Sequence, residues 1–385
     1  MMTQELIHLA NASSISRSSA PSIQTPSTLA RIETDWGRVS VRTKHYRWPV
    51  QSNRSREVPR RHYAPAAPES HHWGIVLAGG DGVRLRQLTQ SVWGADRPKQ
   101  FCPLLGNRTL LEDTRHRAER SVPPDQILYS VTQAHEQYYF PSLADRPSQR
   151  IVQPSNRGTA PAILSALIHM ARRDPKAIVV ILPCDHYYSP ESAFTIALES
   201  AFEIAEQRSR SIVLLGVEPK SPEVDYGWIE LGETIDGHSG LSHVGAFQEK
   251  PPLAVAEALF RAGSLWNTFV MVGPVCTFLE MAWDTVPNLL QALESREVAS
   301  SPSGEIRIPD AVYDRIATTD FSREVLSSAT DRLLALRLRN IEWSDLGDPY
   351  RVLVTLLEKN GALPSWAKLW PEANTSIPRV SAATA

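Results

Sequence analysis

The sequence is poor in cysteine, lacks a long apolar run and has almost balanced charge. Its three cysteines, Cys102, Cys184 and Cys276, are odd in number and far apart. This pattern fits neither a disulfide framework nor a zinc site, and it favours a reducing compartment. The longest purely apolar stretch, about residues 177–182, is far shorter than the roughly 20 residues of a membrane-spanning helix. The first residues also lack the basic start and apolar core of a signal peptide, so we expect a cytoplasmic protein.

A formal net charge of -2 and a hydrophobic content of 42% are typical of a globular protein. The near-neutral charge gives no reason to expect nucleic acid or an anionic membrane as a partner. At 385 residues, the chain can hold one large α/β domain and a smaller one, or two ordinary domains.

Residues 1–72 differ in composition from the rest of the chain. They are rich in Ser, Pro, Arg and Thr, with few apolar clusters, which predicts a disordered extension. Its ten Arg and Lys residues outnumber its five acidic residues. The excess of basic charge could bind an acidic partner, but a solvated tail or a misassigned start codon explains the composition as well.

Apolar runs alternate with helical patterns from Trp73 onward. Strands are expected at residues 74–78, 127–131, 177–182 and 211–217, and helices at residues 110–120, 160–173 and 192–207. This alternation predicts an α/β fold with a doubly wound, mostly parallel, Rossmann-like sheet. In such sheets, ligands bind beyond the carboxyl ends of the strands.

The pattern becomes mixed after residue 220. Strands are expected at residues 228–231, 244–249, 268–272 and 333–338, and helices between residues 276 and 298 and at residues 350–359. We therefore expect a core at residues 73–300, a smaller mixed α/β C-terminal part at residues 301–362 and a loose tail at residues 363–385.

A glycine-rich turn, Gly79-Gly80-Asp81-Gly82, follows the first expected strand. Such a turn lets backbone N–H groups approach phosphate oxygens, and the nearby Arg84 can hold them. The competing interpretation is a structural turn with an incidental arginine. Lys99 stands among apolar residues, where an ammonium group is costly to bury unless it meets an anion. Taken alone, it could equally be a surface lysine.

Together, GGDGVRLRQLT at residues 79–89 and RPKQF at residues 97–101 resemble the sugar nucleotidyltransferase family, whose pattern is GGxGxRLxPLT followed by PK. Further elements occur in the family's order: QPSNRGTAPAI (153–163), LPCDH (182–186), YGWIE (226–230), FQEKP (247–251), WNTF (266–269) and WSDLG (343–347). The resemblance covers nearly all of residues 73–350. Several elements have the form found in mannose-1-phosphate guanylyltransferases.

The resemblance implies an enzyme that transfers a nucleotidyl group from a nucleoside triphosphate to a sugar 1-phosphate and releases pyrophosphate, with GTP and mannose 1-phosphate as the first choice of substrates. It assigns Arg84 to the β and γ phosphates, Lys99 to the charge at the α-phosphate and Lys250 to the sugar phosphate. Asp185 and Asp345 would hold Mg²⁺, which prefers oxygen ligands. From the sequence alone, Asp185 could instead cap a helix and Asp345 could form a turn.

The other implied contacts fall into two groups. The nucleotide-binding residues would be Leu77, Ala78, Gly79, Gly80, Gly82, Gln153, Gly158 and Thr159. The sugar-binding residues would be Gly227, Glu230, Glu249 and Asn267.

The chain departs from the family pattern at several positions. Gln87 replaces a proline, Asn156-Arg157-Gly158 replaces the commoner G-R-N order, and Phe269 replaces the glycine of the WNxGxF element. These changes leave the base and the sugar open. The alternatives are a uridylyl- or thymidylyltransferase that acts on glucose 1-phosphate, a non-catalytic relative that binds nucleotide sugars, and a scaffold protein. The sequence does not indicate the oligomeric state.

Overall fold

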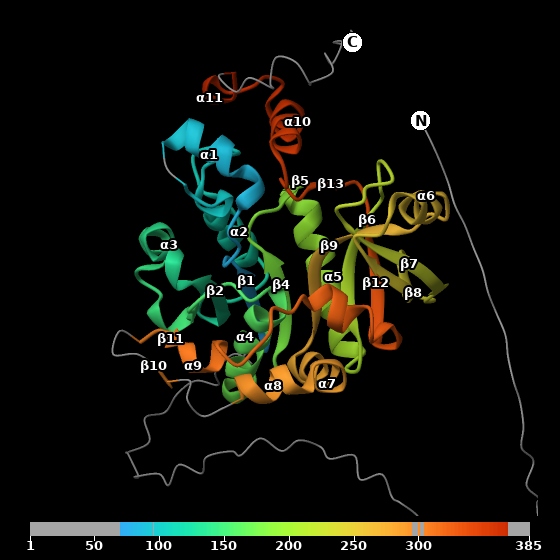
Figure 1. Cartoon of the computed structure of the whole chain (residues 1–385). Coiled ribbons are helices and arrows are strands. Elements are labelled where there is room, and N and C mark those ends of the chain that lie inside the picture. Colours follow the sequence, from blue (N-terminus) through green and yellow to red (C-terminus); the bar gives the residue numbers. More distant parts are fainter. Residues whose placement is uncertain (1–69, 95, 295–298, 301–303, 369–385) are drawn as a thin grey trace, which may run out of the picture. The chain divides into compact units, whose positions relative to one another are not determined.

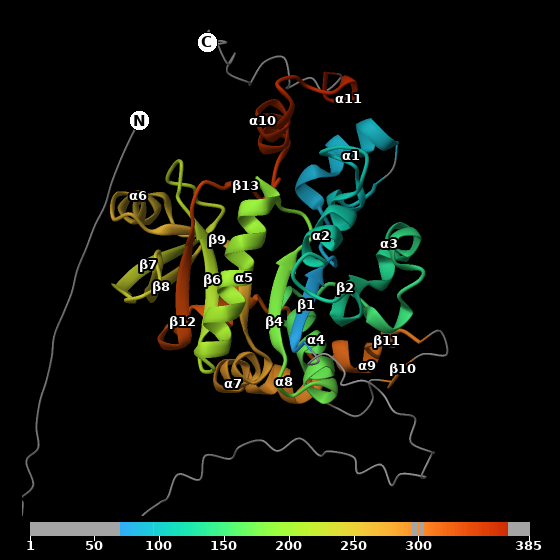
Figure 2. The same cartoon turned by 180° about the vertical axis from the view of Figure 1, so that it is seen from behind.

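The computed structural model describes residues 70–94, 96–294, 299–300 and 304–368 (Figures 1 and 2). Nearly all of the expected N-terminal extension lies outside these residues, as do residues 369–385 of the expected tail. The described start of that tail carries a short helix, α11 (Ser365–Lys368). No helix of the described ranges is both long enough and apolar enough to cross a bilayer.

Within the described residues, eleven strands form one sheet. In spatial order they are β10 (Ala299–Ser300), β11 (Ile306–Arg307), β3 (Arg150–Gln153), β2 (Ile127–Thr132), β1 (His72–Leu77), β4 (Ile178–Pro183), β9 (Leu265–Pro274), β6 (Ile212–Val217), β12 (Leu333–Leu338), β8 (Leu241–Glu249) and β7 (Gly227–Thr234). β7 also pairs with the start of β9. A separate two-stranded ribbon joins β5 (Tyr187–Ser189) to β13 (Glu342–Ser344).

The expectation of a mostly parallel sheet is correct for one half only. β11, β3, β2, β1 and β4 run parallel to one another. Beyond β4, the pairings of β9 with β4, β6 and β7 are antiparallel, as are those of β8 with β7 and β12. The sheet is therefore mixed. β7 and β8, for example, follow each other without the long crossover that parallel pairing requires.

The expected boundary at residue 300 does not divide the sheet. β12, which follows that boundary in sequence, lies between β6 and β8. Its buried LLAL segment pairs in parallel with β6, from Leu333 opposite Ile212 onward. The C-terminal part thus supplies an inner strand of the same sheet.

Helices cover the sheet on both faces. The longer ones are α1 (Arg86–Trp93), α2 (Leu110–Ala118), α3 (Glu136–Leu143), α4 (Thr159–Arg173), α5 (Glu191–Gln207), α6 (Leu253–Arg261), α7 (Val275–Thr285), α8 (Pro287–Leu293) and α10 (Pro349–Asn360). Buried side chains of α2, α3 and α5 share one core cluster with alternate residues of the strands, such as Val76, Val180 and Val213. α5 lies in front of β4 and β6 in Figure 2. α4, α7 and α8 pack on one another outside that cluster, with α4 also against β1, β2 and β3.

Local sequence sets the ends of the helices nearest the site. Thr109 and Glu112 form a reciprocal capping box at the start of α2, which satisfies two otherwise free backbone donors. α10 begins after Asp348, whose carboxylate accepts from the Arg351 backbone, and ends at Gly361 in the left-handed conformation, as glycine readily allows. Figures 1 and 2 show α1, α10 and the β5–β13 ribbon at the same end of the sheet.

Candidate active site

A cavity of about 370 Å³ lies beyond the carboxyl ends of β1, β3 and β4. Antiparallel β9 brings its starting residues to the same edge, since Ile181 near the end of β4 pairs with Met271. Thirteen of the residues expected at the site line this cavity: Leu77, Gly79, Gly80, Arg84, Gln153, Gly158, Thr159, Asp185, Gly227, Glu249, Lys250, Asn267 and Asp345. Segments nearly 270 residues apart in sequence therefore converge as the motifs predict.

Four expected residues do not line it. Ala78 is buried and its carbonyl accepts from the Gln100 side chain. Gly82 starts a short turn with a φ of 59° and lies against the backbone of Lys99. Glu230, which is expected among the sugar contacts, is exposed. Side chains alternate along a strand, so Glu230 points to the face of β7 opposite to Gly227. Lys99 is buried beside the cavity.

The part of the cavity that Gly79 and Gln153 line is built from backbone and amides. Gln153 donates from Nε2 to Ser130 Oγ at 3.0 Å and accepts from the Tyr313 hydroxyl at 2.7 Å. A Cβ at Gly79 would stand 2.9 Å from Thr132 Oγ1, which only glycine avoids. The Asn156 side chain donates to Asp81 at 2.9 Å, so it joins the loop before α4 to the glycine-rich turn.

The loop before α4 is fixed by a segment from the C-terminal part. The Thr319 backbone donates to the Arg157 carbonyl, and its own carbonyl accepts from Ala160 at 3.0 Å. Gly158 has a φ of 88°, and a Cβ there would collide with the Thr319 carbonyl. The order Asn-Arg-Gly, which departs from the family pattern, thus puts glycine where the backbone requires it.

Lys99 lies beneath the two acidic residues rather than in the cavity wall. Only 9% of Lys99 is exposed. Its ammonium donates to the carbonyls of Asp345 at 2.6 Å and Leu346 at 3.0 Å, and lies 3.2 Å from an Asp185 carboxylate oxygen. Lys99 was expected to contact the α-phosphate, but its ammonium contacts protein oxygens. A buried ammonium needs such partners to offset its loss of hydration.

Asp345 is the most highly connected acid of the site. Its Oδ1 accepts from the Tyr226 hydroxyl at 3.0 Å and from the Gly347 backbone at 2.9 Å. Burial alone would raise the pKa of the Asp345 carboxyl, but the charges of Lys99 and Arg351 outweigh it, and the net pKa is lowered. The carboxylate is thus held ionised in the cavity wall.

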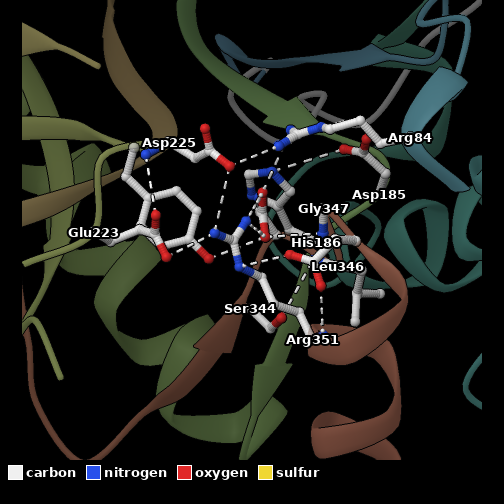
Figure 3. Close-up of polar contacts among 12 residues, drawn as sticks. Arg84, Asp185, His186, Glu223, Asp225, Ser344, Leu346, Gly347 and Arg351 are labelled. Atoms are coloured by element: carbon white, nitrogen blue, oxygen red, sulfur yellow. Dashed lines mark hydrogen bonds and ion pairs between the residues drawn. The ribbon is translucent and has the colours of Figure 1, made fainter. Parts of the chain in front are cut away.

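Arg351, on α10, is a residue that the motif pattern did not reveal (Figure 3). Its guanidinium contacts Asp345 at 3.2 Å and Glu223 at 2.7 Å, and its central carbon lies 4.6 Å from the centre of the Tyr226 ring. Burial would lower the pKa of Arg351, yet the charge of Asp345 and the other acids raises it overall. The only sequence signal is an arginine six residues after Asp345.

Arg84 and Asp225 form a more exposed pair at the mouth of the cavity. They lie 3.2 Å apart, and Arg84 also approaches Asp345 at 3.9 Å. The Arg84 side chain is 54% exposed, so an anionic ligand can compete for it. Asp225 lines the cavity and was not expected there; it directly precedes the YGWIE element.

Glu249 and Lys250 line the same cavity, where β8 ends. Lys250 has a φ of 51°, its backbone donates to the Tyr226 carbonyl, and its ammonium lies 3.3 Å from Glu249. Burial raises the pKa of Glu249, although Lys250 opposes the shift. The Lys250 side chain is 48% exposed, which leaves it free to meet an incoming phosphate.

His186, the last residue of the LPCDH element, also lines the cavity, where a histidine can serve as a ligand or in a structural role. Its Nδ1 accepts from the Trp343 indole at 3.3 Å, which leaves Nε2 toward Asp185 at 3.8 Å. Burial lowers the pKa of His186 despite the nearby Asp185 and Asp345. The imidazole is therefore neutral near pH 7, and the indole bond supports the structural role as well.

Asp185 and Asp345 both reach the cavity and share Lys99 as a partner. Within the described residues, no group of three or more His, Cys, Asp or Glu residues has the arrangement of a metal site. Mg²⁺ is commonly held by one or two carboxylates together with substrate phosphates and water, so two carboxylates in the wall of one cavity fit this ion.

Comparisons with known proteins agree with this geometry. The profile described as "Nucleotidyl transferase" matches residues 73–354. The chain is 28% identical to the xanthan biosynthesis protein XanB of Xanthomonas campestris pv. campestris (strain B100) over 74% of this chain and 60% of that protein. It is 29% identical to mannose-1-phosphate guanylyltransferase 2 of Escherichia coli O157:H7 over 77% of this chain and 58% of that enzyme. The chain thus spans about three fifths of the length of these curated relatives.

A solved structure is similar as well. The crystal structure titled mannose-1-phosphate geranyltransferase, from Thermus thermophilus, aligns with a TM-score of 0.60 and 29% identity, over 72% of this chain and 77% of that one. The residues that the family profile matches include the cavity and all the motifs that line it.

Proposed function

Since the chain belongs to the nucleotidyl transferase family, we propose that it joins GTP to mannose 1-phosphate, with GDP-mannose and pyrophosphate as products. Relatives named mannose-1-phosphate guanylyltransferase support this choice of substrates. The observation that carries the proposal is that two exposed cations, Arg84 and Lys250, line one cavity together with the acids Asp185 and Asp345.

The reaction requires little covalent chemistry from the protein. A sugar 1-phosphate is largely dianionic near neutral pH and needs no general base. One of its oxygens attacks the α-phosphorus of the triphosphate, the new P–O bond forms, and the bond to the β-phosphate breaks to release pyrophosphate. Because two anions must meet in line, positioning and charge stabilisation supply the catalysis.

Each cation has a defined task in this scheme. Arg84 leaves Asp225 and binds the β and γ phosphates, which is feasible because the pair is exposed and such pairs are weak. Lys250 holds the phosphate of the sugar, and the buried carboxylate of Glu249 accepts from sugar hydroxyls. Lys99 holds Asp185 and the 345–346 backbone in place. It supports the α-phosphate through these groups.

Asp185 and Asp345 would hold Mg²⁺ at the phosphates. When bound, this ion neutralises phosphate charge and orients the triphosphate. The protein's own contribution is to hold both carboxylates in place and to keep Asp345 ionised through the charges of Lys99 and Arg351.

Pyrophosphate release tests the proposal. The full chain, incubated with GTP, mannose 1-phosphate and Mg²⁺, should release pyrophosphate in an amount equal to the GDP-mannose identified by mass. EDTA should abolish the reaction and excess Mg²⁺ should restore it. A chain that binds GDP-mannose but forms neither product with any triphosphate would be a non-catalytic relative.

A further inference from the structure

Phe269 adopts a backbone conformation that residues with a Cβ avoid. Its φ is 62°, in the left-handed region that favours glycine. The sequence places it where related chains have the glycine of the WNxGxF element. A strained residue in a site is a reason to look for a function that offsets the strain.

A β-bulge produces this conformation. Leu214 pairs with Met271 and Gly216 pairs with Asn267, so the stretch of β9 between the two pairs is two residues longer than the facing stretch of β6. Phe269 stands in the middle of that stretch, and its backbone donates to Asn267 Oδ1 at 3.1 Å. Bulges redirect side chains next to active sites.

The redirected side chain lines the cavity rather than the core. Phe269 is one of the cavity-lining residues, and every other residue of β9 is buried. Val270 and Val272 belong to the core cluster that packs under α5, whereas Phe269 is not a member of it. Core packing of its ring therefore does not account for the strained backbone.

The neighbours of Phe269 in the cavity wall place it at the sugar end. The same cavity is lined by Gly227, Glu249, Asn267 and Phe269. Gly227 pairs with Glu249 across β7 and β8, and the Asn267 side chain accepts from the Phe269 backbone. Glu249 and the Asn267 amide offer polar contacts, while the Phe269 ring offers an apolar one. A pyranose has both kinds of surface, with hydroxyl groups on its rim and C–H bonds across its face.

We propose that Phe269 determines sugar specificity: its ring covers the C–H face of the bound hexose and excludes 1-phosphates of N-acetylated hexoses. This inference rests on the proposed function, because it assumes a sugar 1-phosphate in the cavity. Relatives with glycine at this position lack such a ring, so the exclusion belongs to this chain's own sequence.

Two substitutions separate the ring from the backbone strain. Phe269→Gly removes both, and Phe269→Leu keeps an apolar side chain in the strained conformation without the aromatic face. Asn340→Gly is the control for relief of strain, because Asn340 has a φ of 56°, is exposed and does not line the cavity.

The measurement is kcat/KM of each full-length protein for mannose 1-phosphate and N-acetylglucosamine 1-phosphate, with the triphosphate that wild type uses best. Phe269→Gly should raise the ratio in favour of the N-acetylated sugar at least about 10-fold, the scale of a small steric change in a pocket. Phe269→Leu should raise KM for mannose 1-phosphate about 5-fold, in the range of a lost aromatic contact, with KM for the triphosphate unchanged. Asn340→Gly should match wild type in the ratio of the two kcat/KM values and in KM for mannose 1-phosphate.

If both Phe269 variants change thermal stability but leave the sugar ratio and KM at wild-type values, Phe269 only fills space and the inference is wrong. Failure of the proposed function looks different. In that case wild type itself prefers another triphosphate or sugar phosphate, and the variants are compared on that pair. Calorimetric affinities for the two sugar phosphates give the same ratio for a chain without turnover.

Discussion

The guanidinium of Arg351 lies 3.2 and 3.3 Å from the two carboxylate oxygens of Asp345. Arg351 comes from α10 and Asp345 from the loop after β13, so the start of the last long helix fixes an acid of the candidate site. Together with Lys99 on the other side, this contact explains why Asp345 stays ionised although it is largely buried.

Replacing either candidate metal ligand should reduce turnover strongly. Asp185→Asn and Asp345→Asn should each lower kcat at least ~100-fold, the scale of one preorganised electrostatic contact. Asp345→Asn should also lower the free energy of unfolding by about 2 kcal/mol, because Arg351 loses one charge-assisted contact while it keeps Glu223. Kinetics and denaturant titrations of both variants are compared with Asp314→Asn, an exposed residue outside the cavity. If one of the two acids proves dispensable, it is a cap or turn residue.

Removing Arg351 should shift the pH profile. In Arg351→Gln, the positive charge that lowers the pKa of Asp345 is gone, so that pKa rises. The acid limb of kcat/KM should therefore move to higher pH, while the plateau changes less. Arg337→Gln is the control, since Arg337 lies on β12, pairs with Glu218 and does not line the cavity. An unchanged acid limb in Arg351→Gln, with a loss of stability alone, would show that Arg351 is only a structural contact.

Substitution of Lys250 and of Arg84 should each affect the binding of a different substrate. Lys250→Ala should raise KM for the sugar 1-phosphate about 10- to 150-fold, the range for loss of a charge-assisted contact, with GTP affinity nearly unchanged. Arg84→Ala should weaken GTP and spare the sugar phosphate. Matched titrations with each substrate check this, with Lys176→Ala as the exposed control. The reverse pattern would mean that the two substrates bind in the opposite sense.

Stability should fall below pH 6.5 in part because of His169 on α4. Burial, helped by Arg173 and Arg172, lowers the pKa of His169 from 6.5 to about 4. Between these values the unfolded chain binds a proton that the folded chain does not, so the free energy of unfolding decreases as the pH falls. His169→Gln should remove up to about 3 kcal/mol of this decrease between pH 7 and pH 4.

Denaturant titrations at several pH values measure the effect. The exposed His243→Gln serves as the control. A His169→Gln protein whose stability falls as steeply as that of wild type would contradict the assignment of this proton to His169.

The sequence predicted most of the site because its motifs end strands or follow them. Asp185 follows β4 and Gly79 follows β1, and parallel strands bring such ends to one edge. The apolar periodicity predicted the helix α4 and the strand β12 within a residue or two of their ends.

The rest depends on contacts that no local pattern encodes. Glu230 was expected in the cavity wall but does not line it, because a motif does not say on which face of a strand each side chain lies. Arg351 was missed because its partners Glu223 and Asp345 are separated from it by 128 and 6 residues of chain. The mixed half of the sheet was missed because apolar runs have the same composition in parallel and antiparallel pairings.

The central claim is that this cavity joins a guanine nucleotide to mannose 1-phosphate, and kcat/KM for competing substrate pairs tests it most directly. Wild-type protein with Mg²⁺ should give a higher kcat/KM for GTP with mannose 1-phosphate than for UTP or dTTP with glucose 1-phosphate, and Asp185→Asn and Asp345→Asn should each lower turnover of every pair at least ~100-fold. An equal or higher value with UTP and glucose 1-phosphate would contradict the choice of substrates, and turnover near the wild-type value in both variants would contradict the choice of site.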